Sequence, residues 1–159
     1  MQQVSRREKV KPVAFIVLAA VAMLSAACRS SPPQISIEAA RAELSGAVIG
    51  EAMVTMSIKN QGGPDVLAGV KADVPGAKAA FHTMQGERMV EVDSMNIPAK
   101  STVELRLPGS HIMISDMPKT MVTGSPISVI LTFQKSGEKR IALTLQAAPA
   151  MPMGHMHHM

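Results

Sequence analysis

Short segments in which polar and apolar residues alternate recur along residues 35–148, with turns rich in Gly, Pro, Asn and Asp between them. Alternation with a period of two indicates strands that are buried on one face only. The segment 127–133, ISVILTF, is the most apolar of them and is predicted to lie centrally in a sheet. About eight to ten such strands in ~115 residues are typical of an antiparallel β-sandwich with a single core.

The core of this sandwich has to be aliphatic, because the chain has no Trp or Tyr and only three Phe. One segment, residues 38–50, is rich in alanine and is compatible with a helix or with an extended strand. Turns are predicted at 60–65, 74–76, 85–87 and 135–139. Strands are predicted at 35–37, 52–58, 66–70, 77–81, 88–92, 102–107, 127–133 and 140–146.

Residues 1–27 have the order of a lipoprotein-type signal peptide. Basic residues at 6–11 precede an apolar run of about 15 residues, which is shorter than the ~20 residues that a membrane-spanning helix needs. The sequence LSAAC at 24–28 resembles a bacterial lipobox, so Cys28 is predicted to be the lipidated first residue of the mature protein. Residues 28–34 would then form a tether to the membrane, outside the cytoplasm. Plain secretion and an uncleaved anchor are the alternatives.

Charge and cysteine content exclude several classes of protein. Four of the 16 basic residues precede Cys28 but only one of the 12 acidic residues does, so the net charge of +4 lies mainly in the leader. The remaining domain is nearly neutral and lacks aromatic stacking platforms, so no nucleic-acid partner is expected. Cys28 is the only cysteine, which excludes an internal disulfide and a blue-copper centre. No phosphate-binding loop or nucleophile elbow occurs, and no enzymatic activity is predicted.

Two His-x-Met pairs, His82 with Met84 and His111 with Met113, carry the clearest chemical signal. All five histidines lie within two residues of one of the 14 methionines. Residues two apart in a strand share a face, so an imidazole and a thioether can converge on one ion. Thioether sulfur selects Cu(I), and imidazole also suits copper. Two such pairs on neighbouring strands would form a Cu(I) site with two nitrogens and two sulfurs.

The segment 81–113 resembles the periplasmic copper(I) chaperone family PCu(A)C. That family has a histidine, a methionine about a hairpin later, and then His-x-Met after 21 residues, which is also the number between Met89 and His111. The likeness continues at IPA (97–99), TVEL (102–105) and PG (108–109). The resemblance implies a cupredoxin-like β-sandwich that is extended around Arg41. The Cu(I) ligands it implies are His82, Met89, His111 and Met113.

The interval between His82 and Met89 departs from the family pattern. Only six residues separate them, fewer than the family usually has, so the hairpin is predicted to be short. Met84 and Met95 are therefore the alternatives for the second ligand. Met53 and Met56 fall on opposite faces of the predicted strand 52–58 and are assigned to packing.

Residues 149–159, PAMPMGHMHHM, are predicted to form a flexible metal-binding tail. Proline and glycine disfavour regular structure there, and the segment has no apolar core of its own. Its thioethers suit Cu(I), and its imidazoles also suit Cu(II). The predicted tail ligands are Met151, Met153, His155, Met156, His157, His158 and Met159.

These features predict an extracytoplasmic copper chaperone that is monomeric and held to the membrane by a lipid at Cys28. The resemblance implies that it delivers Cu(I) to the copper centre of a respiratory oxidase, either directly or through a Sco-like thiol protein. Two alternatives stay open. One is a lipoprotein that sequesters copper for resistance, and the other is a structural β-sandwich lipoprotein that binds no metal.

Overall fold

The computed structural model describes residues 31–147, so the predicted leader, Cys28 and the predicted tail lie outside the described residues. Every regular element in this range is a strand, which confirms the all-β prediction. Within it, no helix is long and apolar enough to span a membrane. The ten strands are β1 (Ile35–Leu44), β2 (Ala52–Asn60), β3 (Asp65–Ala72), β4 (Lys78–Gln85), β5 (Arg88–Val92), β6 (Met95–Ile97), β7 (Ser101–Leu105), β8 (His111–Ser115), β9 (Pro126–Phe133) and β10 (Gly137–Gln146).

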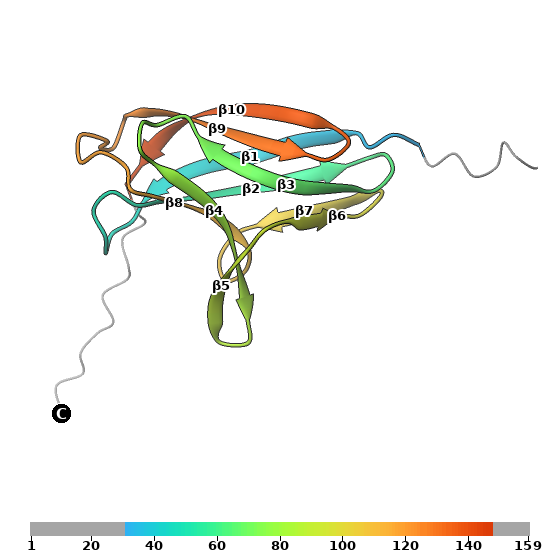
Figure 1. Ribbon diagram of the computed structural model, residues 1–159, viewed down its shortest axis with the longest axis horizontal. Coiled ribbons are helices and arrows are strands. Elements are labelled where there is room, and N and C mark those ends of the chain that lie inside the picture. The colour runs from blue at the N-terminus through green and yellow to red at the C-terminus, as the bar shows by residue number, and fades with distance from the viewer. Residues whose placement is uncertain (1–30, 148–159) are drawn as a thin grey trace, which may run out of the picture. The chain divides into compact units, whose positions relative to one another are not determined.

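The strands form two sheets that are joined through β1 and β10 (Figure 1). Sheet A has the order β5-β4-β8-β2-β1, and β7 also pairs with β2; sheet B has the order β10-β9-β3-β6. Eight of the nine strand pairs are antiparallel. The exception corrects the prediction of an antiparallel sandwich, because β1 and β10 run parallel, with Ala42 opposite Leu145. A parallel pair needs a long connection, and the eight strands between β1 and β10 supply it.

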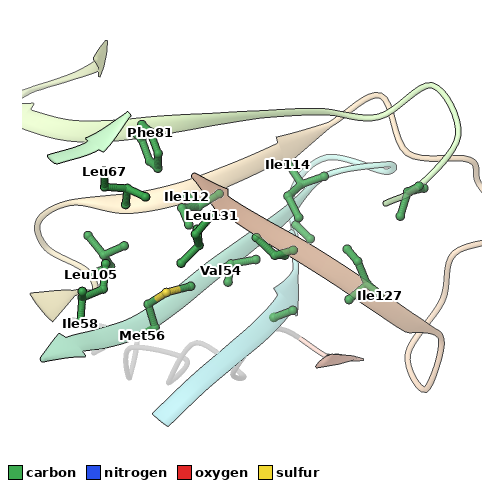
Figure 2. Close-up of a cluster of buried hydrophobic side chains, with 14 of the residues drawn as sticks. Val54, Met56, Ile58, Leu67, Phe81, Leu105, Ile112, Ile114, Ile127 and Leu131 are labelled. Carbon is green, nitrogen blue, oxygen red and sulfur yellow. The ribbon is translucent and has the colours of Figure 1, made fainter. Parts of the chain in front are cut away.

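Alternation along each strand decides which side chains reach the core. In β2 the residues Val54, Met56 and Ile58 are buried, while the residues between them are partly exposed (Figure 2). Strand β9 alternates in the same way and lies between β10 and β3, so its predicted central position is confirmed. Each fully buried Val, Leu or Ile contributes about 1.5–3 kcal/mol to folding. The residues of sheet A that alternate with the buried ones form its outer face, and the candidate site lies there.

The alanine-rich segment 38–50 is extended up to Leu44 and then forms a loop. A β-bulge interrupts the pairing of β1 with β2 between Glu38 and Arg41, and Ala39 there has a positive φ of 51°. Bulges shift the register of a strand locally. The helical alternative is therefore wrong, because β-pairing with β2 overrides the helix propensity of the alanines.

Asp65, at the start of β3, holds the turn between β9 and β10. One carboxylate oxygen accepts hydrogen bonds from the amides of Val66 (2.8 Å) and Lys135 (2.9 Å). The other accepts from the amide (3.0 Å) and the hydroxyl (2.6 Å) of Ser136. Burial raises the pKa of this carboxyl, but the hydrogen bonds from Ser136, Lys135 and Val66 together outweigh burial and lower the pKa below 3.8.

The lowered pKa of Asp65 makes stability depend on pH. A carboxyl whose pKa is lower in the folded state contributes stability above its unfolded pKa, and this stability is lost as the pH falls through the folded pKa. We expect Asp65→Asn to lower the free energy of unfolding by about 1.5–3 kcal/mol at pH 7, and by progressively less as the pH falls below 3.8 and through the lowered pKa of the folded state. Urea titrations at pH 7, 5 and 3 measure this. Asp73→Asn is the control, because Asp73 is exposed and its ion pair with Arg140 is worth about 0–1 kcal/mol. A pH-independent loss for Asp65→Asn would contradict the prediction.

Candidate metal site

Strands β4 and β8 place the two histidines of the described residues side by side. His82 and His111 are direct cross-strand partners, and their ring centroids are 5.7 Å apart with an interplanar angle of 72°. Both lie on the outer face of sheet A, because their neighbours Phe81 and Ile112 point into the core. The predicted opposite orientation of Phe81 and His82 is confirmed. A metal–imidazole bond is about 2 Å long, so one ion can contact both rings at this separation.

Hydrogen bonding at the two rings leaves lone pairs for a metal. Nδ1 of His111 lies 3.1 Å from the carbonyl oxygen of Gly109. A carbonyl oxygen can only accept, so Nδ1 carries the proton and Nε2 of the neutral ring keeps its lone pair. Metal-bound histidines usually have their second nitrogen satisfied in this way. Nε2 of His111 and Nδ1 of His82 are both buried without a hydrogen-bond partner. An unpaired buried polar atom costs about 1–3 kcal/mol, and a bound ion would relieve that cost.

The loop 106–110 delivers His111 to this position. β7 and β8 pair with the same edge of β2, β7 opposite residues 56–60 and β8 opposite residues 52–54, so the chain loops out between them. The hydroxyl of Ser110 in this loop lies 2.9 Å from the hydroxyl of Thr83 on β4. The loop is therefore attached to the strand that carries His82. His111 is fully buried although it belongs to the outer face.

Three of the predicted methionines lie on the same face as the histidines. Met113 follows His111 by two residues on β8, opposite the small side chain of Ala80. Met84 and Met89 are cross-strand partners on the β4–β5 hairpin, which projects from the other strands (Figure 1) and turns at residues 86–87 as predicted. Their side chains are 37% and 45% exposed. Met84 lies two residues beyond His82, so both hairpin thioethers are beside the histidine pair.

Met95 is not brought to the histidines. It lies on β6, pairs with Leu67 of β3 in sheet B, and packs against the core. Its position follows from the chain crossing to the other sheet after β5. Met56 is 2% exposed, in agreement with its assignment to packing.

Sequence reasoning missed two neighbours of the site. Met53, for which the sequence predicts a packing role, lies on the outer face directly opposite Met113 in the β2–β8 register. Glu91 lies opposite His82 across the β4–β5 hairpin and is exposed. The alternation of β2 put Met53 on the face away from the core, but its pairing with Met113 depends on the order of strands that are far apart in sequence.

The donors that the structure brings together are two imidazole nitrogens and several thioether sulfurs. Between residues 31 and 147 there is no group of three or more His, Cys, Asp or Glu side chains suited to a metal ion. Thioether sulfur with imidazole is a donor set that favours Cu(I). The residues of the site therefore fit a soft monovalent copper ion.

Comparison with solved structures defines the class of fold. The copper-bound PCuAC domain from PmoF2 is 27% identical with a TM-score of 0.60, and the match covers 74% of this chain and 97% of that domain. The apo PCuAC domain from PmoF1 is 24% identical, with a TM-score of 0.62 and the same coverage. Apo-DR1885 from Deinococcus radiodurans is 18% identical, with a TM-score of 0.53, and covers 93% of this chain and 95% of its own. The chain therefore has a PCuAC-like fold, as the resemblance implied.

Residues 35–145 match the model of the protein family described as "Putative lipoprotein LpqE-like". Because this match spans most of the chain, the protein belongs to the LpqE-like family. Comparison with curated proteins gives no match.

Proposed function

We propose that this protein is an extracytoplasmic copper chaperone that binds Cu(I) through His82, His111, Met113 and a methionine of the β4–β5 hairpin. The observation that carries the proposal is the pair of adjacent imidazoles whose buried Nδ1 and Nε2 atoms lack partners, beside thioethers on the same face. The PmoF2 domain, which shares 27% identity, was solved with copper bound, and this supports copper as the ion.

Two features of the site favour delivery over storage. The hairpin methionines Met84 and Met89 are exposed, whereas His111 is fully buried. An incoming ligand of an acceptor protein can therefore displace a hairpin thioether first, while the imidazoles still hold the ion. Copper stays in the +1 state throughout, because thioethers and imidazoles exchange as neutral ligands. The protein then acts by ligand exchange, without an enzymatic step.

The LpqE-like family description names a lipoprotein, which supports export and a lipid anchor at Cys28. The acceptor we propose is the copper centre of a respiratory oxidase or a Sco-like thiol protein. The His- and Met-rich residues 149–159 would capture additional copper, including Cu(II) through their imidazoles.

Competition with a chromophoric Cu(I) chelator tests this proposal on a chain that lacks residues 149–159. We expect one Cu(I) per chain, and His82→Ala or Met113→Leu should weaken binding at least about tenfold, because each removes a direct ligand. Met84→Leu and Met89→Leu should each have a smaller effect, since either hairpin sulfur can replace the other. Met95→Leu is the control and should leave the affinity unchanged. Cu(I) binding that survives His82→Ala unchanged would refute the proposed site.

A further inference from the structure

The outer face of sheet A is polar away from the candidate site. Such a face is expected where one side of a sheet meets water. Apart from the bulge at 39–40, Met53 is the only apolar residue that β1, β2 and β7 place on this face, all three strands lying within the described residues. The polar residues of these strands on that face are Ser36, Glu38, Arg41, Glu43, Thr55, Ser57, Lys59, Thr102 and Glu104.

Packing in the core does not account for Met53. Its neighbours Ala52 and Val54 are fully buried, so Met53 points to the opposite side and is partly exposed. Its cross-strand partner on β1 is Glu43, whose charged group offers no apolar contact surface. A methionine in this position is only partly buried and gains less from burial than one on the core face.

Its register places Met53 next to the proposed ligands. Met53 is the direct partner of Met113, and the Cβ atoms of such partners are about 4.5–5.5 Å apart. His111 precedes Met113 by two residues on the same face and is therefore diagonal to Met53, at about 7–8 Å between Cα atoms. On the other side of Met113 stands only Ala80. The long, flexible side chain of methionine can reach an ion at either distance.

We infer that Met53 is a further Cu(I) ligand, which takes the fourth coordination position when the hairpin methionine leaves it. In this exchange the bond between copper and the sulfur of Met84 or Met89 breaks and a bond to the sulfur of Met53 forms, while copper stays +1 and no proton moves. His82, His111 and Met113 hold the ion in both states. The inference rests on the proposed function and names the residue that keeps the ion fully coordinated while the exposed hairpin contacts an acceptor.

Methionine methyl NMR tests this inference on the full-length chain. With ¹³C-labelled methionine methyls, Cu(I) titrated to saturation should shift the signals of both Met113 and Met53, each assigned by its Met→Leu variant. In the double variant Met84→Leu/Met89→Leu the shift of Met53 should be larger, because no hairpin sulfur competes. Adding Met53→Leu to that double variant should weaken Cu(I) binding at least about tenfold further, measured by the chelator competition on the chain that lacks residues 149–159.

The matched control is Met56→Leu, which removes a methionine from the same strand on the core face and should change neither the methyl shifts nor the affinity. If Met113 shifts while Met53 does not, and the triple variant binds as tightly as the double variant, the inference fails and the proposed function stands. If neither Met113 nor Met53 responds to Cu(I), the proposed function itself fails.

Discussion

Replacing His111 by leucine should abolish Cu(I) binding at the site without strongly destabilising the metal-free protein. Mutating a residue that only hydrogen-bonds to a metal ligand typically lowers metal affinity about 10–100-fold. Loss of a direct ligand should therefore weaken Cu(I) binding at least about 100-fold. The substitution has two opposite effects on the free energy of unfolding of the metal-free protein. Leucine removes the unpaired Nε2 atom, which relieves about 1–3 kcal/mol, and loses the hydrogen bond to Gly109, worth about 0.5–1.5 kcal/mol. Together these ranges allow a change in the free energy of unfolding between a loss of about 0.5 kcal/mol and a gain of about 2.5 kcal/mol, so the variant should not be strongly destabilised.

Urea unfolding with and without Cu(I) measures both effects of His111→Leu in one experiment. A ligand that binds only the folded state adds about 2.7 kcal/mol when its free concentration is 100 times its dissociation constant. The wild-type protein should gain this stabilisation and the variant should not. Copper that binds the folded and unfolded chains equally does not change the free energy of unfolding. Met95→Leu is the control and should respond to Cu(I) like wild type. A variant that unfolds in the absence of metal, or that is still stabilised by Cu(I), would show that His111 serves the fold and not the metal.

The strands that sequence analysis located best are those with clear alternation. Residues 52–58 and 127–133 correspond to β2 (Ala52–Asn60) and β9 (Pro126–Phe133). The three-residue strand β6 was missed because a period of two cannot be recognised over so short a length. β8, HIMIS, was also missed, because Met113 on the outer face is apolar and interrupts the alternation of polar and apolar residues. The parallel pairing of β1 with β10 joins the two ends of the fold, and no local pattern encodes it.

The residues of the candidate site also differ in how far the sequence predicts them. The spacing within each His-x-Met pair predicted that its two residues share one face of a strand. That the two strands lie side by side followed only from the family resemblance, and the register of β4 with β8 shows it for His82 and His111. The choice between Met84 and Met89 could not be made from spacing, and the structure explains why: the two residues are partners across one short hairpin. Met53 was inaccessible to sequence reasoning, since its register with Met113 is set by how β2 and β8 align in sheet A.

Asn60→Ala should be among the most destabilising single substitutions on the surface-to-core boundary of this domain. The Asn60 side chain is 1% exposed and makes four hydrogen bonds. Its Oδ1 accepts from the amides of Gln34 (3.1 Å) and Gly62 (3.0 Å), and its Nδ2 donates to the carbonyls of Gly63 (2.7 Å) and Pro98 (2.9 Å). The residue thus joins the segment before β1 to the turns that follow β2 and β6.

Water cannot easily replace the two buried bonds, to Gly62 and Gly63, because the turn packs directly against the segment before β1. A Cβ atom on Gly62 would lie 2.0 Å from the carbonyl oxygen of Pro32, which leaves no room between them. Alanine at position 60 would leave the amide of Gly62 and the carbonyl of Gly63 buried without a partner, each at a cost of about 1–3 kcal/mol. The bonds to Gln34 and Pro98 are part-buried, and losing them costs about 0.5–1.5 kcal/mol each. We expect a loss of about 3 kcal/mol or more in the free energy of unfolding, measured by urea titration at pH 7.

Two further variants separate hydrogen bonding from simple loss of volume at Asn60. Asn60→Asp keeps the acceptor and the shape but points a second oxygen at the carbonyls of Gly63 and Pro98, so it should be at least as destabilising as alanine. Asn96→Ala, at an exposed position on β6, should change stability by less than about 0.5 kcal/mol. If Asn60→Asp is as stable as wild type, the two donated bonds do not hold this end of the sandwich together, and segment 32–34 must be held by its backbone contacts to Gln61 and Gly63 instead.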